Sequence, residues 1–483
     1  MGFLPFFSLE TWILLITFIC IFVMYGYWTY GVFEKLGIPG PKPFMYLGSV
    51  CRSNPVYYLD DLECAKKYGR LWGTYELKMP MLVVMDPDML KTILVKECFT
   101  YFTNRRVRTH KINTKRNKRQ KNVVQKTLYR SRVMELMFSI MKHHSRKLTD
   151  RLQSRLGNDD VIIVKDFFGP YSMDVMASCA FNVDMDSINN PSGTPLFFHS
   201  TFFLYIDRYL LGVSLFTKTS TAFFKAIVEK IRAERTGSSH QNSGDLLQHM
   251  INSQTVNEPR KEEQNKGLTD HEIISQVTMF LFAGYETSAT TLVFLVYTLA
   301  RNPEVMKRLQ KEIDSTFPNK GPVQYEALMQ MEYLDSVVNE CLRLYPPAAR
   351  IERVAKETVK INGVTIPKDI VVMIPVYALH RDPELWPEPE EFKPDRFSKE
   401  NKQSINSYTY LPFGVGPRNC IGMRFALVMA KLALVEVLQN YSFSVCKETE
   451  IPLQMDPEGL LGPLRPIKLK LEKRSTTSEN VDN

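Results

Sequence analysis

The chain is best understood from the segment Pro412-Phe413-Gly414-Val415-Gly416-Pro417-Arg418-Asn419-Cys420-Ile421-Gly422. A long apolar run follows it, from Gly422 to about Asn440, and predicts a helix. The N-terminus of a helix favours negative charge, because its first backbone N–H groups are unpaired and the helix dipole points its positive end there. We therefore expect the thiolate form of Cys420 to be stabilised.

The other residues of this segment indicate a bulky, flat ligand with an acidic group. Gly414, Gly416 and Gly422 lack a Cβ and would let the backbone approach such a ligand closely. Arg418 supplies a cation for the acidic group. A thiolate in this setting suits a metal held in a planar macrocycle. The alternative is a buried structural cysteine, which is common for this residue type.

The spacing Phe413-Gly414-x-Gly416-x-Arg418-x-Cys420-x-Gly422 resembles the haem-binding signature of the cytochromes P-450. In that family the cysteine thiolate is the axial ligand of the haem iron and favours O–O cleavage. The resemblance implies haem b as the cofactor and a mainly α fold with small β-sheets. It assigns the iron to Cys420 and haem contacts to Phe413, Gly414 and Arg418.

A second informative segment lies inside an apolar run from about Thr269 to Ala300, which predicts a core helix. Gly284 within that helix costs about 1 kcal/mol relative to alanine. Close approach of a ligand plane would explain the glycine, and tight helix packing is the alternative. Thr287 is expected to turn its hydroxyl to a backbone carbonyl or a water.

The motif Ala283-Gly284-Tyr285-Glu286-Thr287 resembles the oxygen-activation motif of the same family. The resemblance implies that Ala283 and Gly284 border the haem. It also implies that Glu286 and Thr287 are the catalytic residues, which deliver protons. The neighbouring Phe282 would contact substrate.

A third motif combines Glu340-x-x-Arg343 with Pro394-Asp395-Arg396-Phe397. It resembles the structural Glu–Arg–Arg network of these proteins, so Glu340, Arg343 and Arg396 are expected to hold the core together. By the same resemblance, Arg353 and Arg105 join Arg418 in binding the haem propionates. The remaining substrate-facing positions would be Ala348, Ala349 and Leu460.

The N-terminal region predicts a membrane anchor. No charged residue occurs from Thr11 to Phe33. The stretch from Trp12 to Tyr30 is long enough to span a bilayer core, which takes about 20 apolar residues. A cleaved signal peptide is the alternative, but a basic n-region and a small-residue cleavage site are both missing. Lys35 and Lys42 follow the span, so the positive-inside rule places the rest of the chain in the cytosol.

The expected organisation has four parts, a transmembrane anchor (1–33), a proline-rich linker (34–44), a catalytic domain (45–473) and a polar tail (474–483). Within the linker, the run Ile38-Pro39-Gly40-Pro41-Lys42-Pro43 cannot be helical and is expected to be stiff. It resembles the hinge of microsomal members of the family. We therefore expect a single-pass protein of the endoplasmic reticulum membrane.

Charge and cysteine usage narrow the function further. The eight cysteines show no CxxC or zinc spacing, which indicates a reducing compartment without a disulfide framework. The net charge of +9 could suggest nucleic acid, but twelve Lys/Arg and no Asp/Glu fall between Arg105 and Arg132, and removing these leaves −3. We therefore expect no nucleic-acid partner.

The basic segment from Arg105 to Arg132 departs from the family pattern. No tryptophan occurs between Trp72 and Trp386, so the family's Trp-x-x-x-Arg pair, which holds a propionate, is missing. A divergent loop, an altered exon and a basic interaction surface remain open explanations. The substrate-roof helices expected within Phe197 to Phe224 also look short for the family.

Phrases such as Phe-Ala-Gly-Tyr-Glu-Thr and Gly-Pro-Arg-Asn-Cys-Ile-Gly-Met resemble subfamily A of family 3 in particular. The resemblance implies a monooxygenase that oxidises bulky lipophilic compounds, including steroids and drugs. Its electrons would come from NADPH-cytochrome P-450 reductase, in some members with cytochrome b5. Two alternatives are a catalytically impaired variant that binds haem loosely and a membrane-anchored binding protein without haem.

Overall fold

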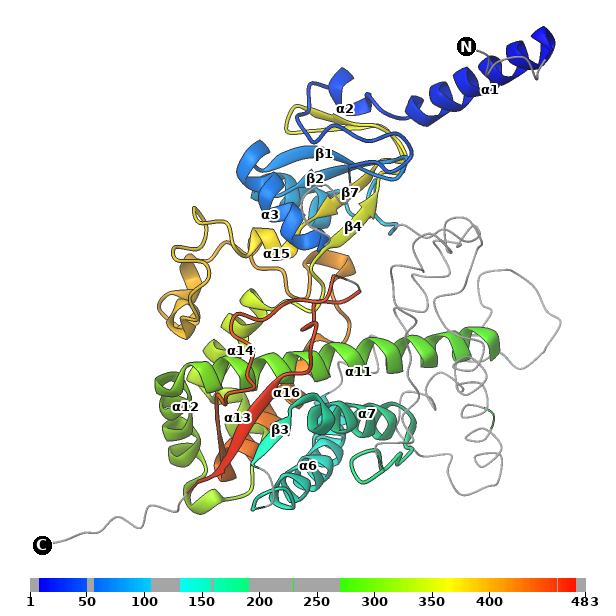
Figure 1. Ribbon diagram of the computed structural model, residues 1–483. Coiled ribbons are helices and arrows are strands. Elements are labelled where there is room, and N and C mark those ends of the chain that lie inside the picture. The colour runs from blue at the N-terminus through cyan, green and yellow to red at the C-terminus, as the bar shows by residue number, and fades with distance from the viewer. Residues whose placement is uncertain are drawn as a thin grey trace, which may run out of the picture. The chain divides into compact units, whose positions relative to one another are not determined.

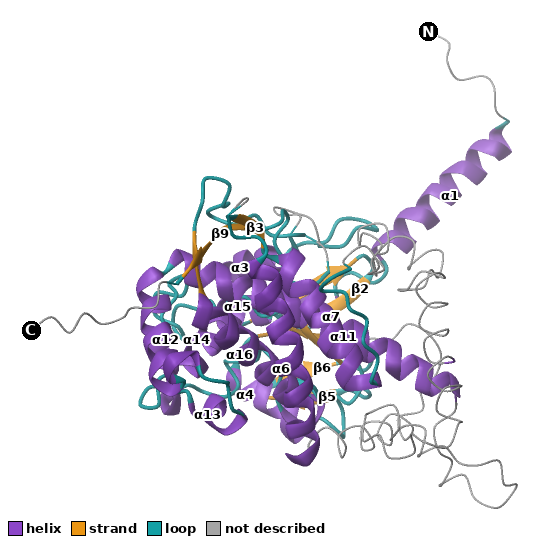
Figure 2. Cartoon of the chain, turned by 90° about the horizontal axis from the view of Figure 1, so that it is seen from below, coloured by secondary structure: helices purple, strands orange, loops and turns teal. Residues whose placement is uncertain are grey.

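The computed structural model describes residues 8–49, 56–105, 131–157, 160–190, 229, 270–457 and 459–474. Helices make up most of these residues, and the strands form three small sheets (Figure 2). The chain divides into two compact units. The first comprises Met1–His110, Ala348–Pro389 and Asn406–Asn419, and the second comprises Lys111–Pro347, Glu390–Ile405 and Cys420–Asn483.

The first unit is built on a four-stranded sheet in the order β1, β2, β7, β4. Its strands are β1 Leu71–Glu76, β2 Met79–Val84, β7 Val371–Ile374 and β4 Ile351–Val354. β2 runs antiparallel to β1 and parallel to β7, and β4 runs antiparallel to β7. A separate hairpin joins β5 Val359–Ile361 and β6 Val364–Ile366.

The alternating sequence from Trp72 to Met85 predicts a hairpin that turns at Lys78-Met79-Pro80. The hairpin is present, but its turn is tighter and lies earlier. Glu76 pairs with Met79, so Leu77 and Lys78 alone form the turn, and Leu77 has a φ of 53°. Pro80 therefore lies inside β2. It is tolerated there because the β2–β7 ladder begins only at Met81, beyond the proline that lacks an N–H.

The helices of the first unit are short except for α1. They are α1 Leu9–Tyr27, α2 Val32–Lys35, α3 Tyr57–Tyr68, α4 Pro87–Lys91, the π-helix η1 Thr92–Lys96 and α15 Val376–Leu379. Asp86-Pro87 predicts a capped helix that runs to about Lys96. The cap is confirmed, because Asp86 Oδ1 accepts the N–H of Met89 at 2.8 Å. The helix predicted to continue to Lys96 changes to π geometry after Lys91.

The second unit is mostly helical. Its α-helices are α6 Ser131–Gln153, α7 Lys165–Phe181, α11 Asp270–Arg301, α12 Pro303–Thr316, α13 Tyr325–Gln330, α14 Glu332–Leu344 and α16 Met423–Asn440. Its 3₁₀ turns are η3 Pro318–Lys320, η4 Pro394–Phe397 and η5 Lys402–Ser404. One sheet has the order β3 Val161–Ile163, β9 Lys468–Lys473, β8 Tyr441–Ser444.

The predicted core helix is confirmed as α11, the long green helix of Figure 1. Every residue from 288 to 300 is buried. α7 and α16 pack against it, and α6 packs against both of these. The window Ser275–Arg301 is long and apolar enough to cross a membrane, but half of it is buried, so its apolar surface faces the protein core.

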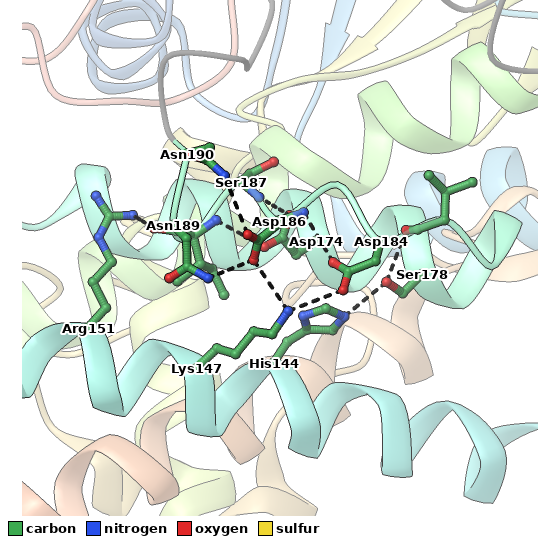
Figure 3. A network of polar contacts seen from close by, with 12 residues as sticks. His144, Lys147, Arg151, Asp174, Ser178, Asp184, Asp186, Ser187, Asn189 and Asn190 are labelled. Carbon is green, nitrogen blue, oxygen red and sulfur yellow. Dashed lines mark hydrogen bonds and ion pairs between the residues drawn. The ribbon is translucent and has the colours of Figure 1, made fainter.

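The loop after α7 is held by a polar network within the second unit (Figure 3). Both carboxylate oxygens of Asp174 accept backbone N–H groups, from Ser187 at 2.8 Å and from Ile188 at 3.0 Å. Lys147 of α6 donates to Asp184 and Asp186 of the loop. The loop is thus fastened to both α6 and α7.

α1 is the other described helix long and apolar enough to span a membrane, within Glu10–Tyr27. Only a small part of that window is buried. The helix begins and ends three residues before the span Trp12 to Tyr30, because Ser8 caps it and the chain turns after Tyr27. The expected roof helices in 197–224 and nearly all of the basic segment lie outside the described residues.

Candidate functional site

The glycine-rich loop of the first unit is shaped by its own backbone contacts. Gly416 has a φ of 75°, and a Cβ there would lie 2.3 Å from the carbonyl oxygen of Leu94 in η1. Gly414 has a φ of 67°. Both glycines are therefore required by left-handed backbone, and Gly416 also by packing. A Cβ at Gly422 would meet only Cys420 Sγ, at 4.0 Å.

A histidine that the sequence reading did not single out supports the start of this loop. His380 is fully buried after α15, and its Nε2 accepts the backbone N–H of Leu411 at 2.8 Å. Leu411 O in turn accepts the N–H of Gly414 at 3.0 Å. A buried histidine 31 residues away carries no local sequence signal, which is why only the structure reveals this contact.

Three arginines predicted to bind an anion come together in the first unit. Arg353 lies on β4, and the bridge between Asn104 and Val354 brings Arg105 beside that strand. Arg105 Nη2 donates to the carbonyl oxygen of Arg418 at 3.3 Å. Arg418 ends the 3₁₀ turn η6 Gly416–Arg418. The family resemblance assigned all three arginines to the haem propionates, and the structure places their side chains close together.

Arg353 and Arg418 form no ion pair among the described residues. Arg353 is 1% exposed, and neither it nor Arg418 pairs with a carboxylate there. The Nε of each is buried without a hydrogen-bond partner. Burial, and then the charges of Arg105 and Arg418, lower the pKa of Arg353 to about 10. Because an uncompensated buried cation is costly, the cluster fits an anionic group such as a haem propionate.

Cys420 is the first residue of the last segment of the second unit, Cys420–Asn483. Its side chain is exposed, and it forms no disulfide. Gly422 is the N-cap of α16, so the predicted placement of Cys420 just before a helix is confirmed. The other six described cysteines also form no disulfide.

The acid and alcohol expected to handle protons lie in the middle of α11. Thr287 Oγ1 donates to the carbonyl oxygen of Ala283 at 2.6 Å, so the predicted hydroxyl–carbonyl contact is confirmed. Ala283 is exposed and Thr287 is half-buried. Glu286 Oε1 lies 2.6 Å from Lys165 Nζ at the start of α7. No sequence pattern predicted this ion pair.

The glycine inside α11 has a packing partner. A Cβ at Gly284 would lie 2.3 Å from Cε and 2.4 Å from Sδ of Met176 on α7. The expected reason for the glycine was a ligand plane, whereas the observed contact is a methionine, which favours the packing alternative. A cofactor contact at Gly284 remains a prediction.

The third motif is assembled in the second unit. Arg343 Nε and Nη2 lie 2.8 and 2.9 Å from the two oxygens of Glu340, and Arg396 Nε lies 3.3 Å from Oε1. The N–H of Lys393 also donates to Glu340, and Arg343 donates to Glu391 O. The network ties α14 to the segment around η4.

The expected substrate positions differ in exposure. Phe282 is half-buried on α11, and Ala348 is exposed. Ala349 is 2% exposed, and its carbonyl accepts the N–H of Tyr377. Leu460 is half-buried, while its neighbour Leu461 is fully buried and bonds Pro347 through its N–H.

Comparison with known proteins decides the family. The profile described as Cytochrome P450 matches residues 38–471. The chain belongs to the cytochrome P450 family. Members of this family bind haem through a cysteine thiolate and are monooxygenases, so the cofactor and the enzyme class follow from membership. Cytochrome P450 proteins share a helix-rich fold with small sheets, as found here.

Relatives within the cytochrome P450 family place the chain more closely. It is 53% identical to Cytochrome P450 3A27 of Oncorhynchus mykiss over 510 residues, covering 100% of this chain and 98% of the relative. It is 52% identical to Cytochrome P450 3A40 of Oryzias latipes, covering 99% and 100%. For Cytochrome P450 3A13 of Mus musculus the identity is 46%, covering 99% of both. The chain is thus a P450 of the 3A type.

The alignment with the Oncorhynchus relative spans 510 residues, more than the 483 of this chain. The alignment must therefore contain gaps in this chain, which agrees with the expectation that some of its segments are shorter than those of the family.

Proposed function

We propose that this chain is a haem-thiolate monooxygenase that oxidises bulky lipophilic substrates such as steroids and drugs. The observation that carries the proposal is the cluster of Arg105, Arg353 and Arg418, buried in part and without a carboxylate partner for Arg353 or Arg418. When bound, haem would supply oxygen activation, with the balance RH + O₂ + NADPH + H⁺ → ROH + H₂O + NADP⁺.

The residues that would hold the cofactor follow from the motifs. Cys420 would ligate the iron through its thiolate, and the three arginines would bind the propionates. The glycine loop would present Phe413 and Gly414 to the ring, and Ala283 and Gly284 would border it. Glu340, Arg343 and Arg396 hold α14 and η4 together and take no part in the chemistry.

Glu286 and Thr287 would manage protons. Thr287 Oγ1 already holds its proton toward Ala283 O at 2.6 Å, and Glu286 offers a carboxylate on the next residue back. A general acid or base of this kind contributes about 10²–10⁴-fold to a rate. Apolar side chains would hold the substrate by shape. They are Phe282, Ala348, Ala349 and Leu460.

We also propose the four-part organisation, with an anchor at 1–33, a linker at 34–44, a catalytic domain at 45–473 and a polar tail at 474–483. α1 supports the anchor, because nearly all of its apolar side chains are exposed. With Lys35 and Lys42 after it, the catalytic domain would lie on the cytosolic side of the endoplasmic reticulum membrane. The redox partner would be NADPH-cytochrome P-450 reductase, assisted by cytochrome b5.

The direct test uses the full chain in microsomal membranes with the flavoprotein reductase, NADPH and isotopically labelled O₂. Steroids and lipophilic drugs should yield products that carry one labelled oxygen atom, and omission of NADPH should abolish them. Products without the label, or an equal yield without NADPH, would contradict the proposal.

A catalytically impaired variant is the second candidate. It is favoured by one observation, the absence of tryptophan between Trp72 and Trp386, which removes the family's propionate-binding Trp-x-x-x-Arg pair. Such a variant would take up haem and lose it on dilution. Measuring haem per polypeptide before and after gel filtration separates the two candidates, because the active enzyme should keep its ratio unchanged.

A further inference from the structure

One face of α7 lies against the part of α11 that carries the acid and the alcohol. Its residues recur at positions i, i+4, i+7 and i+11, which places them on one side of a helix. They are Lys165, Gly169, Ser172 and Met176. We call this set the α7 stripe.

Each member of the α7 stripe meets a consecutive part of α11. Met176 fills the space above Gly284. Ser172 Oγ donates to the carbonyl oxygen of Tyr285 at 2.9 Å. At Gly169 a Cβ would lie 3.6 Å from the hydroxyl of Tyr285, in ordinary van der Waals contact, so this position lies beside the end of that side chain.

The stripe ends in a charge pair at the functional acid. Lys165 Nζ lies 2.6 Å from Glu286 Oε1, with the lysine side chain 47% and the glutamate side chain 21% exposed. No other ion pair of Glu286 occurs among the described residues. The ammonium is therefore the group that faces this carboxylate, and it also reaches solvent.

We propose that Lys165 is a positioning residue for proton delivery, which holds the carboxylate of Glu286 at the solvent side of α11. This rests on the proposed function, in which Glu286 and Thr287 move protons. An unpaired glutamate side chain would sample several rotamers, and each nonproductive one would interrupt the route from solvent. Lys165 restricts that sampling without touching substrate or cofactor.

The proton inventory of this step is simple. A solvent proton binds a carboxylate oxygen of Glu286 and passes to the hydroxyl oxygen of Thr287. Thr287 releases its own hydroxyl proton to the oxygen atom that leaves as water, so neither residue is changed over a full cycle. Lys165 keeps its own protons throughout. When this delivery is slow, electrons from NADPH end in hydrogen peroxide instead of product.

The first test detects the contact between Lys165 and Glu286 and does not depend on catalytic activity. A water-soluble carbodiimide joins an amine and a carboxylate in direct contact as an amide, with loss of one water. We expect a Lys165–Glu286 cross-link in the purified full chain by peptide mass spectrometry, and its absence in Glu286→Gln. The pair Lys147–Asp184, at 3.2 Å, is the internal reference. Cross-linking of the reference pair alone would overturn the proposal.

The second test measures how the loss of Lys165 affects the hydrogen peroxide formed per NADPH consumed. In Lys165→Met, the peroxide formed per NADPH should rise roughly two- to fivefold, the range that a partly exposed ion pair can impose on an equilibrium. Lys165→Arg keeps the charge and should restore most of the coupling. Lys147→Met removes a comparable ion pair elsewhere in the same unit and should leave peroxide yield unchanged.

The outcomes separate the positioning role of Lys165 from the proton route through Glu286 and Thr287. If Glu286→Gln and Thr287→Ala raise peroxide yield but Lys165→Met does not, the positioning role is wrong and the proton route stands. If none of the three variants changes peroxide yield in an enzyme that forms product, the proton route itself is wrong.

Discussion

Glu340 and Arg343 are joined by two parallel hydrogen bonds, and neither side chain is exposed to solvent. Removing one partner would leave the other charge buried and alone, which costs about 3–5 kcal/mol. We expect Glu340→Ala to lower the free energy of unfolding by that amount, measured by urea titration.

The matched control for this variant is Arg308→Ala, which breaks the exposed pair with Asp395. Exposed pairs contribute only about 0–1 kcal/mol. Equal losses in the two variants would show that burial does not set the energy of the Glu340 network.

Two alanine substitutions in the glycine loop should destabilise the protein to different degrees. Gly416→Ala should be the more damaging one, because its Cβ would lie 2.3 Å from Leu94 O, a backbone atom that cannot move aside. Gly414→Ala adds a methyl group in ordinary contact with Ile351, so it should cost only the left-handed strain of about 1–2 kcal/mol. Unfolding free energy and haem content measure both, and the reverse ranking would contradict this account of the loop.

The contact between Gly284 and Met176 separates two explanations of the glycine. If packing requires it, Gly284→Ala should be destabilising alone and much less so when combined with Met176→Ala, since the second change makes room. A coupling of about 0.5–3 kcal/mol in the double-mutant cycle is expected. If a ligand plane alone excludes a side chain at this position, the two effects should simply add.

His144 predicts a pH dependence of stability. Burial is the largest effect and lowers the pKa of His144 below the ordinary 6.5. The carboxylates of Asp174 and Asp184 raise this pKa in part, and the charges of Lys147 and His143 lower it further. The unfolded chain therefore binds the proton more readily. The stability contributed by neutral His144 is complete above about pH 6.5 and is lost as the pH falls through the folded-state pKa.

The measurement for His144 is the free energy of unfolding over a pH series through that window. His144→Asn should flatten the decline on the acid side. His143→Asn replaces an exposed neighbour and should leave the decline as it is. An identical slope in the wild-type protein and His144→Asn would refute the assignment.

The sequence predicted the parts of the fold that have a local cause. α11 follows from a long apolar run, α4 from Asp86 and Pro87, and the β1–β2 hairpin from alternation. The turn of that hairpin was misplaced, because a proline reads locally as a turn and only the β2–β7 register shows that it is tolerated. Boundaries elsewhere shifted by a few residues where caps decide them.

The site was predicted less completely, for a physical reason. Motif spacing predicted the Glu340 network, which the structure contains, and it made Cys420 and Thr287 candidates for the site. The ion pair between Lys165 and Glu286 and the bond from Leu411 to His380 join residues 121 and 31 positions apart, and no periodicity reports such contacts. The packing of Met176 on Gly284 was missed likewise, since a glycine in a helix does not show what lies above it.

The central claim is that Cys420 ligates a haem iron, and a carbon monoxide difference spectrum of the reduced full-length protein tests it most directly. The wild-type protein should show the red-shifted Soret band of a thiolate ligand, and Cys420→Ser should lose it while Cys446→Ser, at a partly exposed cysteine elsewhere in the second unit, keeps it. A thiolate-type band that persists in Cys420→Ser, or a folded wild-type protein that takes up no haem, would contradict the account.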